Sequence, residues 1–128
     1  MIKVAVGIIV KDGKALLCQR KKTMRYGLKW EFPGGKVENG EPLEECLRRE
    51  LEEELGIAAT IGPLYHRRQY EYPDSGIYDV FYYKVESYAG NIRNRVFEQC
   101  EWAPIESLVS YDILEGNRHV ISMLMEEK

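Results

Sequence analysis

Residues 35–57 read GKVENGEPLEECLRRELEEELGI and carry most of the information about the fold. A glycine opens the segment, Glu41 follows after five residues, and seven more lead to Arg49-Glu50-Leu51. Glu53-Glu54 and Gly56-Ile57 complete it. A pattern with this many fixed positions rarely arises by chance, and it is far more specific than a single glycine-rich loop.

The segment predicts a helix over Glu41–Leu55. Proline is tolerated in the first helical turn, where Pro42 stands, and Gly56 can end the helix. Leucines recur every fourth residue and form an apolar stripe that would face a core. These leucines are Leu43, Leu47, Leu51 and Leu55.

Three glutamates of this helix share one face, because Glu50, Glu53 and Glu54 are spaced i, i+3, i+4. Their like charges destabilise a bare helix, and a hard divalent cation bound by their oxygens would offset that cost. Arg49 precedes Glu53 by four residues and could hold its carboxylate. The alternative is a solvated acidic face whose charges pair with one another.

The preceding segment, residues 30–36 (WEFPGGK), favours the metal site over a solvated face. It predicts a short apolar strand that ends in two glycines, and glycine lets the backbone approach a ligand closely.

Length and composition predict a single domain, residues 1–128, with enough chain to bury a core. The net charge of −3 gives no basic footprint for long nucleic acid.

The cysteines, Cys18, Cys46 and Cys100, show neither paired metal spacing nor an even disulfide framework. We interpret them as small buried apolar groups in a reducing compartment. No signal peptide or long apolar run is recognisable, so we expect a cytoplasmic protein without a membrane partner. Its oligomeric state, monomer or homodimer, is left open by the sequence.

The rest of the chain alternates strand and helix patterns. Strands are predicted over residues 2–10, 15–20, 58–72, 77–85 and 97–103, turns at 11–14 and 73–76, and a polar loop over 21–29. A short helix over 104–109 and a closing helix over 117–126 follow. This mixture favours an α/β (α+β) fold in which a mixed β-sheet lies between helices.

Every fixed position of the Nudix box is filled, so the chain resembles the Nudix hydrolases, which cleave a nucleoside diphosphate linked to another group. Residues 5–9, 31–36, 70–74 and 101–102 look like the MutT branch. That branch hydrolyses nucleoside triphosphates to monophosphates and pyrophosphate, and its best-known members remove 8-oxo-dGTP. The resemblance implies one Nudix domain with an α/β/α sandwich fold.

The resemblance also implies a catalytic metal centre. Glu50, Glu53 and Glu54, with the Gly34 carbonyl, would hold Mg²⁺ or Mn²⁺, with Arg49 beside them. The metal would orient and activate a water for attack on the β-phosphorus. Either Glu50 or Glu98 would act as general base, and the sequence leaves this choice open.

A further metal-binding glutamate of many MutT-like chains has no direct counterpart. It stands six residues before the tryptophan equivalent to Trp102, and that offset lands on Val96. Glu98, four residues before Trp102, is the nearest substitute. Its alternative interpretation is a charge at a strand edge.

Four residues are nucleotide-binding candidates. Arg20 suits bidentate phosphate contact, with a surface cation as the alternative, and Lys36 would hold a phosphate too. Asn117 stands where MutT proteins place the asparagine that reads oxidised guanine, and an amide can both donate and accept. A helix N-cap is the alternative role for Asn117. Phe32 either packs on the base or belongs to the core.

Two questions stay open from the sequence. Asp79, inside an aromatic strand, faces either the nucleotide or solvent at a sheet edge. The substrate is either an oxidised purine triphosphate or another nucleoside diphosphate derivative, such as CTP, a modified pyrimidine triphosphate, a dinucleoside polyphosphate or ADP-ribose. A non-catalytic nucleotide-binding regulator is the alternative of a different class, although a regulator does not need all the metal carboxylates.

Overall fold

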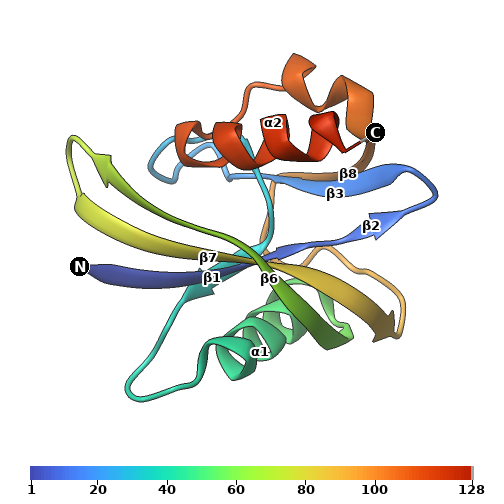
Figure 1. Cartoon of the computed structure of the whole chain (residues 1–128), viewed down its shortest axis with the longest axis horizontal. Coiled ribbons are helices and arrows are strands. Elements are labelled where there is room, and N and C mark those ends of the chain that lie inside the picture. The colour runs from blue at the N-terminus through green and yellow to red at the C-terminus, as the bar shows by residue number, and fades with distance from the viewer. Residues whose placement is uncertain (128) are drawn as a thin grey trace. The chain divides into compact units, whose positions relative to one another are not determined.

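The computed structural model describes residues 1–127 and divides into two compact units, each described by itself below. Unit 1 comprises Met1–Ile8 and Pro33–Arg95, and unit 2 comprises Ile9–Phe32 and the described residues from Val96 onward. Figure 1 shows their helices and strands. No helix within residues 1–127 is long and apolar enough to span a membrane.

Unit 1 is built on a four-stranded mixed sheet with the strand order β5-β1-β7-β6. The strands are β1 (Ile2–Ile8), β5 (Gly34–Lys36), β6 (Ala58–Tyr72) and β7 (Gly76–Ala89). β1 runs antiparallel to β5 and parallel to β7, and β6 and β7 form a long antiparallel hairpin. The helix α1 (Leu43–Leu55) packs against β1, β5 and β6 (Figure 1).

The helix α1 begins two residues later than predicted. Pro42 is extended, with ψ of 150°, and a residue that precedes proline is disfavoured in the helical region, so Glu41 stays outside the helix. Gly56 ends the helix as predicted, in the left-handed conformation with φ of 71°. The last three leucines of the predicted stripe are fully buried, whereas Leu43 is only half-buried.

Unit 2 is built on an antiparallel sheet around a central strand, β3 (Lys14–Gln19). β3 pairs with β2 (Val10–Lys11) and β4 (Trp30–Glu31) and with β8 (Gln99–Pro104). The tight turn between β2 and β3 places both Asp12 and Gly13 at positive φ, 53° and 76°, as a type I′ hairpin requires.

The helical part of unit 2 follows β8. It consists of the 3₁₀ helices η1 (Ile105–Ser110) and η2 (Glu115–Asn117) and the α-helix α2 (Arg118–Glu126). α2 packs against η1, and its buried residues are Val120, Ile121 and Leu124. η1 was predicted over residues 104–109 as an ordinary short helix, and α2 starts one residue later than predicted.

Two predicted strands are wrong in extent, because each divides between the two units. The strand predicted over residues 2–10 breaks at Ile9, so that β1 belongs to the mixed sheet and β2 to the antiparallel one. Residues 30–36 likewise divide into β4 and β5. Side-chain alternation reports whether a strand is extended but not which sheet it joins.

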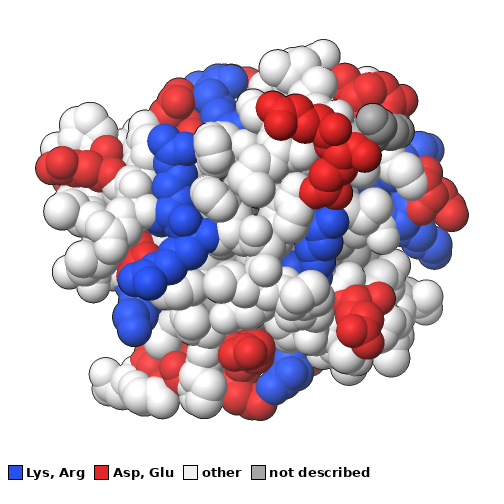
Figure 2. Space-filling view, viewed as in Figure 1, with Lys and Arg blue, Asp and Glu red and all other residues white. Residues whose placement is uncertain are grey.

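The remaining strands need smaller corrections. β6 spans the residues predicted for it, β7 extends four residues beyond the predicted end at Val85, and β8 begins at Gln99 rather than Phe97. The predicted fold class, a mixed α/β structure with a mixed sheet and helices, is confirmed. On the face shown in Figure 2, basic and acidic side chains are interspersed with uncharged surface.

Candidate active site

The turn into β5 brings backbone and carboxylate close together in unit 1. A Cβ at Gly34 would lie 2.1 Å from the carbonyl oxygen of Ala5, and one at Gly35 would lie 2.2 Å from the carboxyl carbon of Glu50. The first glycine therefore lets β5 approach β1, and the second lets Glu50 lie directly against the backbone. Both glycines are required by packing before any ligand is considered.

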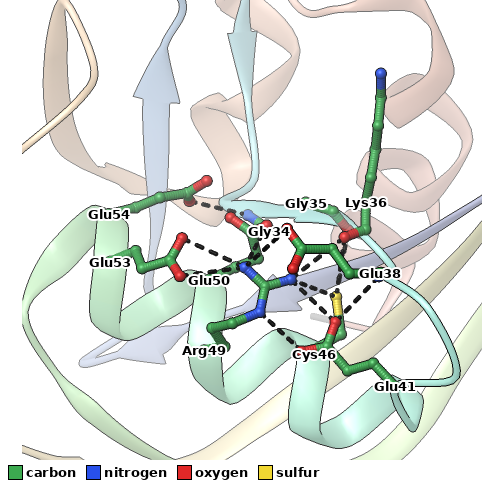
Figure 3. A network of polar contacts seen from close by, with 10 residues as sticks. All are labelled: Gly34, Gly35, Lys36, Glu38, Glu41, Cys46, Arg49, Glu50, Glu53 and Glu54. Atoms are coloured by element: carbon green, nitrogen blue, oxygen red, sulfur yellow. Dashed lines mark hydrogen bonds and ion pairs between the residues drawn. The ribbon is translucent and has the colours of Figure 1, made fainter.

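Arg49 is the centre of the polar network in Figure 3. Its guanidinium donates to both oxygens of Glu41, from Nε at 2.7 Å and from Nη2 at 3.0 Å. Nη1 donates to Glu50 at 3.2 Å and to both oxygens of Glu53 at 3.2 and 3.3 Å, which includes the contact predicted from the spacing. Glu38 completes the set, with an ion-pair distance of 3.8 Å.

Glu38 and Glu41 were not among the predicted site residues. The two hydrogen bonds that Arg49 donates to the Glu41 carboxylate lower the pKa of Glu41 from its ordinary value to about 2. Glu41 also accepts a hydrogen bond from the Glu38 main-chain N–H, at 3.2 Å. The sequence did show Glu41 as a fixed position eight residues before Arg49. The i, i+3 and i, i+4 spacing of helical pairs does not predict a contact between residues that far apart.

Glu50 and Glu54 lie next to the glycine turn. The Gly34 N–H donates to Glu54 Oε1 at 3.2 Å, and Glu54 lies near enough to Glu50 to affect the pKa of its carboxyl group. The pKa of Glu50 is raised, chiefly because burial disfavours its charged form, while Arg49 acts in the opposite direction. Two carboxyl groups held this close need either a shared proton or a cation between them.

The three predicted glutamate ligands of α1 share one helix face but are not arranged as a ready metal cluster. Among residues 1–127, no three His, Cys, Asp or Glu side chains converge as ligands of one ion. The Arg49 guanidinium instead lies between Glu50 and Glu53, and its positive charge offsets their repulsion. The pairing of charges with one another, the alternative raised by the sequence, is therefore present in this structure.

Lys36 contributes to this region through its main chain. Its carbonyl accepts hydrogen bonds from Arg49 Nη2 and from the Cys46 thiol, both at 3.5 Å. The Lys36 side chain is exposed and extends away from the carboxylates (Figure 3).

In unit 2, Arg20 is engaged by its own neighbours. Nη1 donates to both oxygens of Glu31 at 3.2 Å, and Nε donates to the Arg25 carbonyl at 2.8 Å. Burial raises the pKa of Glu31 more than Arg20 lowers it. Sequence reasoning missed Glu31, because its pairing depends on the β3–β4 register, which places it opposite Cys18 and thus on the face that carries Arg20.

The other candidates of unit 2 lie in separate segments. Asn117 is only 6% exposed and precedes α2, but it makes no side-chain capping hydrogen bond. Within residues 1–127 its amide makes no side-chain hydrogen bond, but no buried side-chain nitrogen or oxygen there lacks a partner, so solvent still reaches the amide. Phe32 is buried. Glu98 is exposed just before β8, and its main-chain N–H donates to the Gln19 carbonyl at 2.8 Å.

Asp79 was predicted to face either the nucleotide or solvent at a sheet edge, and the edge interpretation is wrong. β7 is an inner strand of its sheet, and Asp79 is 2% exposed. Both its carboxylate oxygens accept from Arg67, at 2.9 and 2.8 Å, and this lowers the Asp79 pKa. Arg67 also lies over the Phe81 ring, 4.8 Å from its centroid. A buried charge is tolerated here because it is paired and hydrogen-bonded.

Known proteins resemble the chain over nearly its whole length. It is 38% identical over 128 residues to an "8-oxo-dGTP diphosphatase" of Haemophilus influenzae. The aligned residues cover 99% of this chain and 93% of that protein. It is 34% identical to the "CTP pyrophosphohydrolase" of Escherichia coli, over 98% of this chain and 92% of that one.

A solved structure described as MutT from Aliivibrio salmonicida and Vibrio cholerae has a TM-score of 0.83 and 29% identity, and it covers 99% of this chain and 98% of its own. The NUDIX domain model matches residues 1–124, a range that includes the glycine turn, the acidic helix and Arg49. The chain therefore belongs to the Nudix domain family, and it is a Nudix hydrolase.

Proposed function

We propose that this Nudix hydrolase is a divalent-metal-dependent pyrophosphohydrolase that cleaves nucleoside triphosphates to the monophosphate and pyrophosphate, with 8-oxo-dGTP as its preferred substrate. Such an enzyme would remove oxidised nucleotides before DNA synthesis uses them. The observation that carries the chemistry is the position of the Glu54 and Glu50 carboxyl groups directly against the Gly34–Gly35 backbone. The similarity to a named 8-oxo-dGTP diphosphatase supports the substrate.

The donor set fits Mg²⁺ or Mn²⁺. All the candidate ligands are oxygens, which these hard cations prefer, and a bound cation would stabilise the charged form of Glu50, which burial disfavours. Glu50, Glu53 and Glu54 would hold the metal together with the Gly34 carbonyl, and Glu98 would add a further carboxylate. A bound metal supplies a more acidic water and neutralises charge on the phosphates.

The chain's own groups would position the substrate and move the proton. Arg49 would keep Glu53 and Glu41 oriented on α1. The exposed Lys36 amine would bind phosphate oxygens. Arg20 would bind them too, and its guanidinium would then leave Glu31 and pair with the phosphate instead. Either Glu50 or Glu98 would take the proton from the attacking water; the raised pKa of Glu50 is the property expected of a general base.

The purine would be recognised by Asn117. Its amide makes no side-chain hydrogen bond within residues 1–127 and is not sealed from solvent, so it is available to a ligand. A purine edge that offers a donor and an acceptor would match both groups of the amide. Phe32 would support the base-binding region from the core rather than stack on the base, because it is 3% exposed.

Hydrolysis of CTP is the second candidate function. It is favoured by one observation, the 34% identity to a CTP pyrophosphohydrolase over almost the whole of both chains. We also propose that the two units work as one domain, because the family model spans residues of both.

A substrate panel tests the proposal. We expect kcat/KM with Mg²⁺ to be at least about tenfold higher for 8-oxo-dGTP than for dGTP or CTP, a difference of about 1.4 kcal/mol. Chelation with EDTA should abolish turnover. A higher value for CTP would select the second candidate function, and turnover that persists in EDTA would contradict the metal centre.

The position of attack is tested in water labelled with ¹⁸O. Attack at the β-phosphorus places the label in pyrophosphate and leaves the monophosphate unlabelled. Label in the monophosphate would instead show attack at the α-phosphorus and contradict this part of the proposal.

A further inference from the structure

Cys18 and Cys100 face each other across the centre of the unit 2 sheet. They are directly paired in the antiparallel register of β3 and β8, and their sulfur atoms are 3.7 Å apart. The two residues are 82 positions apart in the chain, so only the folded sheet brings them together. Neither thiol has a place in the proposed hydrolysis.

The register makes this pair the closer of the two kinds found in antiparallel sheets. The Ile105 N–H donates to the Gly13 carbonyl, so Gly13 and Ile105 form a hydrogen-bonded pair. The next pair, Lys14 and Pro104, is then non-hydrogen-bonded, in keeping with the missing N–H of proline. The two kinds of pair alternate, and Cys18 lies four positions after Lys14, so Cys18 and Cys100 are again a non-hydrogen-bonded pair. Such pairs have Cα atoms about 4.5 Å apart, within the roughly 4.4–6.8 Å that a disulfide bridges.

The two thiols differ in exposure in a way that suits stepwise oxidation. Cys100 is partly exposed, whereas Cys18, opposite it on the neighbouring strand, is fully buried. From this register, distance and exposure we propose that Cys18 and Cys100 are a redox-active dithiol, which low-molecular-weight disulfides such as oxidised glutathione convert reversibly to an intramolecular disulfide.

The exchange proceeds in two balanced steps. The Cys100 thiolate attacks one sulfur of the small disulfide, a mixed disulfide forms, and one thiolate leaves. Cys18 then loses its proton and attacks the Cys100 sulfur, the Cys18–Cys100 bond forms, and the second small thiolate leaves. Both protein thiols are oxidised, and one small disulfide is reduced to two small thiols.

Cys46 provides the internal control. It is fully buried in unit 1, donates to the Gly35 and Lys36 carbonyls at 3.7 and 3.5 Å, and has a pKa raised to about 12, mainly by burial. It should remain a thiol under conditions that oxidise the pair.

The test incubates the folded full-length protein with oxidised glutathione, blocks remaining thiols in denaturant and counts them by intact mass. The three thiols of the reduced chain should fall to one, with the loss of two hydrogen atoms and no bound glutathione. The melting temperature should rise by at least about 5 °C, because the bond closes a long loop of the unfolded chain. Dithiothreitol should reverse both changes.

Variants make the result specific. Cys46→Ser should still lose the two hydrogen atoms, and Cys100→Ser should lose none and show no rise in melting temperature. Cys100 is partly exposed, so its variant keeps the test valid even where the buried Cys18→Ser fails to fold. Three thiols after oxidation, a stable glutathione adduct at Cys100, or disulfide-linked dimers on a non-reducing gel would each overturn the proposal.

Discussion

The candidate residues of the two units differ in how they are assembled. In unit 1, the glycine turn and the acidic residues lie within one short stretch, on β5 and α1. In unit 2, Arg20, Phe32, Glu98 and Asn117 come from four separate segments. Helical spacing placed the α1 glutamates of the first group, whereas the geometry of the second group depends on strand register and on the path of the chain.

The two groups also differ in how their charges and polar groups are satisfied. Around Arg49, four carboxylates share one guanidinium, and its pKa is raised by them. In unit 2, Arg20 has one carboxylate partner, and the Asn117 amide has no side-chain hydrogen bond within residues 1–127. The contrast implies that changes around Arg49 should act on the chemical step, and a change at Asn117 on substrate choice.

The largest expected effect comes from Glu53→Gln. The variant keeps the shape of the side chain but removes one ligand charge of the proposed metal centre, so kcat should fall at least about a hundredfold, the scale of lost transition-state charge stabilisation. The helix should stay folded, since the variant removes like-charge repulsion on α1. Steady-state kinetics at saturating Mg²⁺ and circular dichroism measure the two quantities.

Glu52→Gln is the matched control for that substitution. Glu52 lies next in the chain and is also exposed, but it pairs with Arg95, at 3.6 Å, rather than with Arg49. Its variant should retain kcat within about twofold, because an exposed ion pair contributes little. A near-normal rate for Glu53→Gln would remove that residue from the metal centre, and an equal loss in both variants would indicate a general effect of helix charge.

Asn117→Ala should have the next largest effect, and it should fall on substrate choice. Loss of a base contact should raise KM for 8-oxo-dGTP at least about tenfold and change KM for dCTP much less. Asn117 makes no capping hydrogen bond, so the melting temperature should change little. An equal change for both nucleotides would contradict base reading. A loss of about 1 kcal/mol of stability with unaltered selectivity would favour the N-cap role.

Local patterns predicted the acidic helix, its glycine stop, the tight hairpin and β6, because each depends on residues close in sequence. The division of residues 2–10 and 30–36 between two sheets was not predictable from alternation. The Arg20–Glu31 and Arg67–Asp79 pairs required strand register, which one sequence does not provide. Glu41 was recognised as a fixed position, but its contact with Arg49 follows from the extended Pro42 before the helix.

Asp79→Asn should affect stability rather than catalysis. Asp79 is buried on an inner strand, but its partner Arg67 is 53% exposed and can turn to water, so the loss should be about 1 kcal/mol at pH 7. Because the folded pKa of Asp79 is lowered, its contribution exists above the unfolded value of about 3.9 and disappears as the pH falls. Urea unfolding measures the loss, and a changed kcat/KM would return Asp79 to the nucleotide site.

Glu41→Gln should have the smallest effect, visible mainly in acid. The folded pKa of Glu41 is about 2, below the unfolded value of about 4.3, so the unfolded state binds more protons between these values. Stability from Glu41 is present above the unfolded pKa and is lost as the pH falls toward the folded one. The variant should therefore lose stability less steeply than the parent between pH 4.5 and about 2 in urea unfolding. The exposed Glu44→Gln, in the first turn of α1, controls for removal of a charge. A parent-like acid slope in Glu41→Gln would show that Arg49 is held by its other carboxylates, and that the network of unit 1 does not depend on the residue preceding the helix.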